Sequence, residues 1–233
     1  MKEHYQTYPR ISPTHLRSEI TSKTVLITGG GYGIGASIAN SFAQAGAHSI
    51  ILAGRTESRL LSTISSLSAS FPATKFTHHV LDITSKASVK KLFDELKTSP
   101  DILVNNAGYL PEPKNFLDID LEEFWKGFEV NVFGTALVTQ SFLRHRRDAL
   151  STATTTTPQE PAVVITLNTI AAYAARAPSL NAYCASKAAS LRWNELLSED
   201  IPPLRRAVHQ CASRGCGERD VYKVGAGWHV HGY

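Results

Sequence analysis

Cysteine and methionine are scarce in this chain of 233 residues, which holds three cysteines and one methionine. The cysteines are Cys184, Cys211 and Cys216, so none lies in the first 183 residues. An odd number with this distribution provides no disulfide framework and is typical of a reducing compartment. We therefore expect a cytoplasmic protein.

Long apolar runs and a strong charge of one sign are also missing. No stretch approaches the ~18 apolar residues that a membrane helix needs. Residues 1–22 are interrupted by charges and predict neither a signal peptide nor a membrane anchor. The net charge is only +4. This scattered excess does not indicate nucleic acid, so we expect neither nucleic-acid nor membrane partners.

What the chain does have is 42% apolar residues, enough for one domain with a sizeable core. Buried-strand patterns alternate with amphipathic helical patterns. The expected strands are 23–28, 49–53, 76–81, 101–104 and 162–167, and the long expected helices are 34–45, 121–145 and 183–199. This order predicts a single α/β domain with a doubly wound parallel sheet, a Rossmann fold. We assign 1–22 to an N-terminal extension, 23–204 to the dinucleotide-binding domain and 205–233 to an atypical tail.

A glycine-rich turn follows the first expected strand and opens the first helix. It reads Thr28-Gly29-Gly30-Gly31-Tyr32-Gly33-Ile34-Gly35. Glycines remove side chains where backbone must approach a pyrophosphate, and a helix N-terminus supplies free N–H groups and positive charge. The turn therefore predicts a dinucleotide site.

Two later segments, taken in their order along the chain, indicate which class of dinucleotide-binding protein this is. Asn105-Asn106-Ala107-Gly108 follows the fourth strand, and Tyr183-Cys184-Ala185-Ser186-Lys187 opens a late helix. Together with the T-G-x-x-x-G-x-G turn, they make the chain resemble the short-chain dehydrogenase/reductase family over roughly residues 20–204. The resemblance implies an oxidoreductase that moves a hydride between a nicotinamide coenzyme and a small carbonyl or secondary alcohol.

The end of the second strand predicts which coenzyme binds. An acidic residue about 20 positions after the glycines would bind a ribose 2′-hydroxyl and repel a 2′-phosphate. Arg55 stands there instead, 20 residues after Gly35. A guanidinium suits a phosphate through its charge and its donor fork, so we expect NADP rather than NAD.

Tyr183 and Lys187 are four residues apart and share one helix face. A free tyrosine has a pKa near 10, and a nearby ammonium lowers that value. Tyr183 would then exchange a proton with the substrate oxygen during hydride transfer. The resemblance adds that Lys187 also bonds the nicotinamide ribose and that Asn131 helps a water chain reach this lysine.

The family usually has a serine at the end of the fifth strand, and here the best match is Thr169. It lies 14 residues before Tyr183, one more than expected. Threonine keeps the hydroxyl but has a stiffer β-carbon. Ser179 is another hydroxyl nearby in sequence, which we place in the loop before the helix.

The complete set of coenzyme contacts that the resemblance implies comes from five segments. It comprises Thr28, Gly29, Gly31, Tyr32, Gly33, Ile34, Gly35, Arg55, Asp82, Ile83, Asn105, Ala107, Gly108, Tyr183 and Lys187. We expect no metal, because nothing completes a site around His229 and His231. The two long late helices resemble those that pair subunits in the family, which implies a homodimer or homotetramer.

The resemblance ends near Leu204, where the family continues into two further strands. We expect those strands to be lacking, which would leave the fifth strand at an edge. The codons of residues 212–221, shifted by one nucleotide, can encode His-Pro-Gly-Val-Val-Glu-Ser-Glu-Met, similar to the missing family segment. This favours a frameshift or a misplaced intron boundary. The alternative function is accordingly a nucleotide-binding pseudoenzyme or a truncated product with little turnover.

Overall fold

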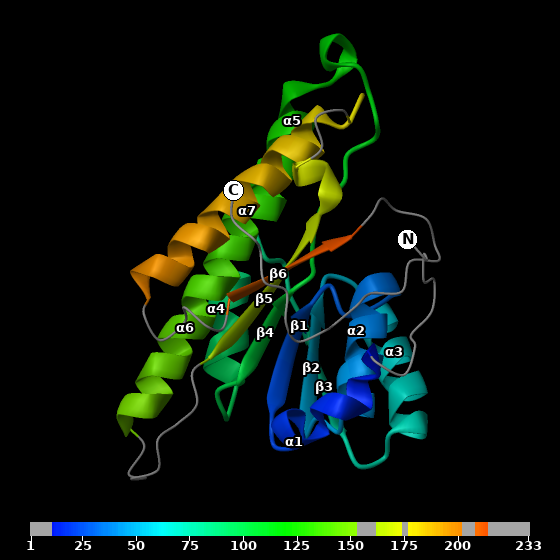
Figure 1. Cartoon of the computed structure of the whole chain (residues 1–233), viewed down its shortest axis with the longest axis vertical. Helices are drawn as coiled ribbons and strands as arrows, with labels where there is room; N and C mark the ends of the chain where they lie inside the picture. The colour runs from blue at the N-terminus through cyan, green and yellow to red at the C-terminus, as the bar shows by residue number, and fades with distance from the viewer. Residues whose placement is uncertain (1–10, 153–161, 174–176, 202–207, 214–233) are drawn as a thin grey trace.

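The computed structural model describes residues 11–152, 162–173, 177–201 and 208–213. Its centre is a six-stranded parallel sheet with strand order β3-β2-β1-β4-β5-β6 (Figure 1). The strands are β1 Thr24–Thr28, β2 Ser49–Gly54, β3 Lys75–Val80, β4 Ile102–Asn105, β5 Val163–Thr169 and β6 Val208–Ser213. The order reverses between β1 and β4, which makes the sheet doubly wound, as the sequence predicts.

Helices cover both faces of the sheet. The described α-helices are α1 Arg17–Ile20, α2 Gly33–Gln44, α3 Glu57–Ser70, α4 Lys86–Glu95, α5 Leu121–Phe128, α6 Thr135–Thr152 and α7 Asn181–Asp200. Figure 1 shows α2 and α3 on one side and α4, α6 and α7 on the other. None of the described helices is both long and apolar enough to cross a bilayer.

The expected continuous helix over 121–145 is a partial error. The structure divides it into α5, a π-helical segment Glu129–Gly134 (η4), and α6. Asp120 caps α5 by accepting a hydrogen bond from the Glu122 backbone N–H at 2.8 Å. A π-helical insertion changes which side chains face inward, and such insertions are common at functional sites.

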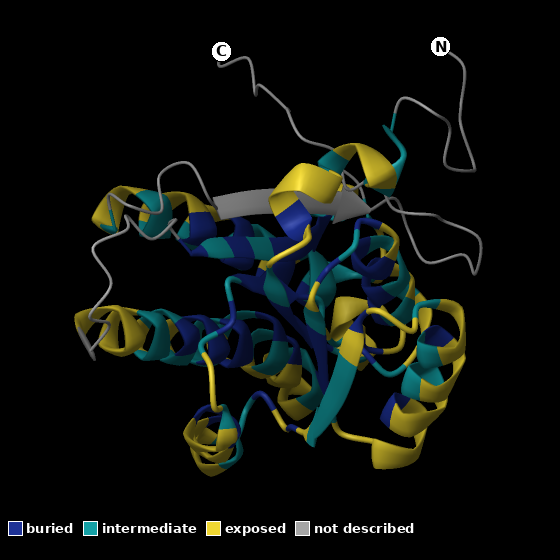
Figure 2. Ribbon diagram, turned by 90° about the horizontal axis from the view of Figure 1, so that it is seen from below, coloured by how far each residue is buried: buried dark blue, intermediate teal, exposed yellow. Residues whose placement is uncertain are grey.

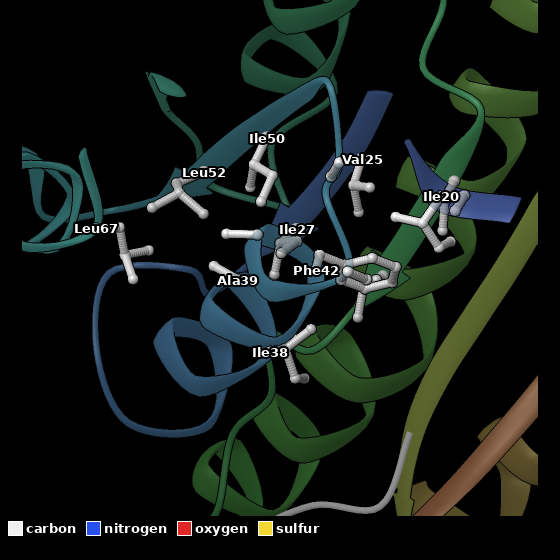
Figure 3. Packing of buried hydrophobic residues seen from close by; sticks show 14 of the residues in the cluster. Ile20, Val25, Ile27, Ile38, Ala39, Phe42, Ile50, Leu52 and Leu67 are labelled. Carbon is white, nitrogen blue, oxygen red and sulfur yellow. The ribbon is translucent and has the colours of Figure 1, made fainter. Parts of the chain in front are cut away.

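Two apolar clusters hold the layers together, because successive residues of a strand point to opposite faces. Val25 and Ile27 of β1 pack with α2 and α3, whereas Leu26 packs with α4 and α6. Figure 2 shows the buried strands between exposed outer helix faces. Figure 3 shows Phe42 of α2 beside β1. Burial on both faces explains why these strands are almost entirely apolar.

The N-terminal extension contributes to the first of these clusters. A 3-10 turn, Pro13–Leu16, leads into α1, and Ile20 is 8% exposed within the cluster around α2. Residues 1–10 of the extension lie outside the described residues.

The expected loss of the sixth strand is wrong. Residues 208–213 form β6, which pairs in parallel with residues 164–169 of β5, from Val164↔Val208 to Thr169↔Ser213. β5 is therefore an interior strand, with β4 beside residues 163–166 and β6 beside residues 164–169. The sequence hides β6 because its short, mixed run matches no strand pattern. Residues 202–207 and 214–233, with most of the predicted tail, Cys216, His229 and His231, lie outside the described residues.

Candidate active site

One cleft of about 610 Å³ opens where β1, β4 and β5 end. The segment after each strand contributes to its wall: Gly29 after β1, Asn106 after β4 and Ile170 after β5. Ligands of doubly wound sheets bind at this position, because the loops separate where the strand order reverses. The cleft has a glycine-rich end and a second end at α7.

Backbone crowding defines the glycine-rich end. A Cβ on Gly35 would lie 2.1 Å from the Gly29 carbonyl oxygen, so only glycine fits there. Gly29 has a φ of +67°, which L-residues rarely adopt. The Asn106 amide donates to the carbonyls of Thr28 and Gly29 at 2.9 and 3.0 Å. Close backbone packing and the Asn106 amide thus fix the shape of the turn, which leaves the start of α2 free of side chains, as a pyrophosphate site requires.

Thr28 acts behind the turn instead of lining the cleft. Its hydroxyl accepts hydrogen bonds from the backbone N–H groups of Asn106 and Ala107, both at 3.1 Å. β1 and the segment after β4 are therefore joined through one buried side chain. This contact fixes the floor of the cleft.

Positive charge gathers beside the glycine turn. Arg55 follows β2 and Arg59 lies in the first turn of α3, and both line the cleft. The Arg59 guanidinium lies 4.7 Å from the centroid of the Tyr32 ring. Asp82, which follows β3 beside β2, also lines the cleft, and its Oδ1 accepts from the Thr84 backbone N–H and hydroxyl at 2.9 and 2.8 Å.

Tyr183 and Lys187 line the other end of the cleft from one turn of α7. Lys187 is only 7% exposed, and its Nζ donates to the Leu167 carbonyl at 2.9 Å. Burial lowers the pKa of Lys187 to about 8. The ammonium is therefore still the main form of Lys187 at neutral pH, although it has little contact with solvent.

Asn131 lies in η4, directly behind this end. It is 1% exposed, and its Oδ1 accepts from the Tyr109 backbone N–H at 2.8 Å. Its Nδ2 donates to the Tyr109 carbonyl at 2.9 Å and to the Ser186 hydroxyl at 3.0 Å. Asn131 thus ties the segment after β4 to α7, on which Tyr183 and Lys187 stand.

Thr169 ends β5 and lines the cleft, and its hydroxyl accepts from the Ala171 N–H at 3.2 Å. Its neighbour Asn168 accepts from the Thr169 N–H at 2.8 Å and donates to the Lys187 carbonyl at 3.0 Å. Asn168 therefore connects the Thr169 backbone to α7. Ser179 lies before α7, as expected, and is exposed outside the cleft wall.

Most of the residues that the sequence analysis selected come together here. The cleft wall contains Gly29, Gly31, Tyr32, Ile34, Gly35, Arg55, Asp82, Ile83, Ala107, Gly108, Thr169, Tyr183 and Lys187. Gly33, Thr28 and Asn131 adjoin it without belonging to its wall. Asn105 does not contribute: its side chain is 4% exposed and donates to Thr139 and Thr166 at 2.8 and 3.4 Å. The neighbouring Asn106 faces the cleft instead, because Asn105 is the last residue of the buried strand.

Sequence reasoning missed a charged group at the α7 end of the cleft. Tyr109 and Lys126 line the cleft, and Lys126 Nζ lies 4.9 Å from the Tyr109 ring centroid. The Tyr109 hydroxyl donates to Glu123, which also accepts from Lys126 at 3.3 Å. Hydrogen bonding to Glu123 raises the pKa of Tyr109, and the same bond lowers the pKa of Glu123. Tyr109 is therefore a poor base at neutral pH.

Metal ligands do not gather at this site. No group of three or more His, Cys, Asp or Glu side chains is arranged to hold a metal ion in the described part of the chain. His78 and His79 of β3 instead contact Glu57 at 3.1 Å and Glu95 at 3.3 Å, respectively.

Comparison with known proteins gives the family. The short chain dehydrogenase profile matches residues 23–214. "Short chain dehydrogenase pigC" of Monascus ruber is 32% identical over 204 residues, which cover 85% of this chain and 63% of that protein. The chain thus spans less than two thirds of the length of this relative.

Two solved structures have the same fold. A short chain oxidoreductase from Pseudomonas aeruginosa PAO1, with NADPH bound and an atypical catalytic center, has a TM-score of 0.69 and 21% identity over 81% of this chain and 69% of its own. NAD⁺-bound xylitol dehydrogenase has a TM-score of 0.72 and 23% identity over 84% and 72%. These two likenesses concern the fold, whereas the family profile, which covers most of the chain, shows that the protein belongs to the short chain dehydrogenase family.

Proposed function

We propose that this protein is an NADP(H)-dependent oxidoreductase that acts on a small carbonyl compound or secondary alcohol. The observation that carries the proposal is that the glycine turn and the Tyr183–Lys187 pair line one continuous cleft. A nicotinamide coenzyme bound along it would supply or accept the hydride. The protein's own task is then to bind, to orient and to move one proton.

Tyr183 is the proton donor in the reduction direction. Its phenol gives a proton to the substrate oxygen as that oxygen gains negative charge, and it takes the proton back during alcohol oxidation. Lys187 supports this step, because a neighbouring ammonium favours the phenolate. The Thr169 hydroxyl orients the substrate oxygen, and Asn131 holds the Tyr109 segment and α7 in register.

NADPH oxidation against a panel of aldehydes, ketones and quinones tests this function. Tyr183→Phe keeps the ring and removes the hydroxyl, so we expect turnover to fall about 10³-fold, within the usual range for a general acid. Turnover that survives Tyr183→Phe would contradict the mechanism. Tight coenzyme binding with no turnover by the intact protein would favour the pseudoenzyme alternative.

Arg55 supports NADP as the coenzyme. It stands where a carboxylate would repel a 2′-phosphate, and it lines the cleft beside Thr56. Calorimetric titration should give tighter binding of NADP⁺ than of NAD⁺ to the wild-type protein. Equal or tighter binding of NAD⁺ would overturn this assignment.

The cellular setting extends the proposal. The scarcity of cysteine supports a cytoplasmic enzyme. The likeness to a Monascus ruber chain supports, by analogy only, a biosynthetic reductase. The exposed Trp125 and Phe133 support subunit pairing through the α5–α6 region. Light scattering of the purified protein would measure its mass and test the last point.

A further inference from the structure

Arg59 belongs to the cleft wall but has no part in the family pattern described above. It lies in the first turns of α3, and α3 is attached to the glycine turn. The Thr63 hydroxyl donates to the Gly31 carbonyl at 2.8 Å, and a Cβ on Gly31 would lie 3.2 Å from the Arg59 Cβ. The base of the Arg59 side chain is therefore fixed relative to the turn.

The tip of this side chain is also held. Its guanidinium lies 4.7 Å from the centroid of the Tyr32 ring, and Tyr32 belongs to the glycine turn. A guanidinium stacked on an aromatic ring uses its flat face for that contact. Its in-plane N–H groups stay available as a donor fork, which is the geometry that phosphate oxygens accept.

The surrounding charges leave this fork without a competing partner. Glu57 of α3 contacts His78 at 3.1 Å, and Oδ1 of Asp82 accepts from Thr84. Within the described ranges, neither Arg55 nor Arg59 forms an ion pair. Two guanidinium groups thus line one cleft without an ion-pair partner among the described residues, which suits a ligand with a doubly charged group.

We propose that Arg59, held on the Tyr32 ring, is a second specificity-determining residue for the ribose 2′-phosphate of the coenzyme. The inference rests on the proposed use of NADP(H) and deepens it. Arg55 supplies one donor group from the end of β2, and Arg59 supplies the other from the glycine-turn side. Tyr32 is the positioning residue, because its ring limits where the guanidinium can go.

The test is calorimetric titration of the full chain with NADP⁺, NAD⁺ and 2′,5′-ADP. Arg59→Met should weaken NADP⁺ and 2′,5′-ADP about tenfold and leave NAD⁺ within about twofold, since a charged hydrogen bond to an exposed site lies near the low end of its usual range. Arg59→Lys keeps the charge but lacks the donor fork, so its affinity for NADP⁺ should lie between those of the wild type and Arg59→Met. Arg147→Met removes an exposed arginine of α6 and should change none of the three affinities.

Two variants of Tyr32 separate positioning from direct contact. Tyr32→Phe keeps the ring and should preserve the preference for NADP⁺ over NAD⁺, whereas Tyr32→Leu should reduce it severalfold. A purely structural contact would instead weaken NADP⁺ and NAD⁺ equally in Arg59→Met, and that result would overturn the inference.

The same titrations distinguish this inference from the proposal beneath it. If the wild-type protein shows no preference for NADP⁺, the coenzyme assignment fails, and the role of Arg59 fails with it. If the wild-type protein prefers NADP⁺ and Arg59→Met keeps the full preference, only the role of Arg59 is wrong. If the wild-type protein prefers NADP⁺ and Arg59→Met loses that preference, the result supports both the coenzyme assignment and the role of Arg59.

Discussion

The two ends of the cleft are built from different parts of the polypeptide. The glycine-rich end consists mainly of backbone from one short segment, where Gly29 and Gly35 touch almost directly. The reaction end consists of side chains from three distant segments, which Asn131 and Asn168 connect by buried hydrogen bonds. Close backbone packing therefore maintains the structure of the glycine-rich end, and buried hydrogen bonds maintain the structure of the other end.

This difference determines how each end fails. Extra volume at the glycine end meets closely packed backbone, which can make room only if the turn or α2 is displaced. Loss of a polar group at the reaction end leaves buried partners unsatisfied but adds no volume. The buried Lys187 also makes the reaction end costly to maintain, because an ammonium there is poorly solvated.

The largest effect on stability is expected from Gly35→Ala. The new Cβ would lie 2.1 Å from the Gly29 carbonyl oxygen, so the turn or α2 must shift. We expect a loss of at least about 3 kcal/mol in the free energy of unfolding, as for severe steric insertions. Urea titration followed by circular dichroism measures it.

Gly33→Ala is the matched control for that variant. A Cβ on Gly33 meets nothing within 4 Å, but φ is +55°. Only the left-handed backbone then opposes the substitution, at about 1 kcal/mol. Equal losses in the two variants would show that conformation, not crowding, controls this turn.

Asn131→Ala should have the next largest effect. It removes three hydrogen bonds and leaves the Tyr109 N–H without its acceptor in a buried site. We expect a loss of about 2–3 kcal/mol, measured by the same titration. An Asn131→Ala protein as stable as wild type would contradict the proposed connection between η4 and α7.

Lys187→Met should act in the opposite direction. Burial lowers the pKa of Lys187 from 10.5 to about 8, which corresponds to about 3 kcal/mol of unfavourable charge burial. Loss of the bond to Leu167 offsets about 1 kcal/mol of this. The coenzyme-free variant should therefore be about 2 kcal/mol more stable at pH 7, and yet inactive.

The pH dependence of that difference gives a second measurement. The unfolded chain binds the Lys187 proton more tightly than the folded chain does, so wild-type stability rises with pH between about 8 and 10.5. The advantage of Lys187→Met should shrink over that window and stay constant below it. An advantage independent of pH up to 10.5 would show that the burial cost is not electrostatic.

The same contrast explains what could be predicted from sequence. The glycine turn and the four-residue spacing of Tyr183 and Lys187 are local patterns, and the structure places both on the cleft wall. Features that depend on contacts between distant segments left no recognisable pattern in the sequence. Arg59 faces the cleft only because α3 packs on the glycine turn. Asn106 lines the cleft in place of the expected Asn105 because β4 ends at Asn105, and sequence patterns do not fix a strand end to one residue.

The break in the helix over 121–145 was hidden for a related reason. A π-helical segment adds a residue to a turn without changing the apolar pattern enough to reveal it. β6 was missed because its place depends on pairing with β5, and parallel pairing leaves little trace in a six-residue segment.

Titration of NADPH fluorescence with three proteins tests the central claim most directly, because it needs no substrate. The wild type and Tyr183→Phe should bind NADPH within about twofold of each other, since the phenol hydroxyl acts in chemistry and the backbone turn acts in binding. Gly35→Ala should bind at least about 100-fold more weakly. If Gly35→Ala bound NADPH like the wild type while Tyr183→Phe lost it, the assignment of binding and chemistry to the two ends of the cleft would be wrong.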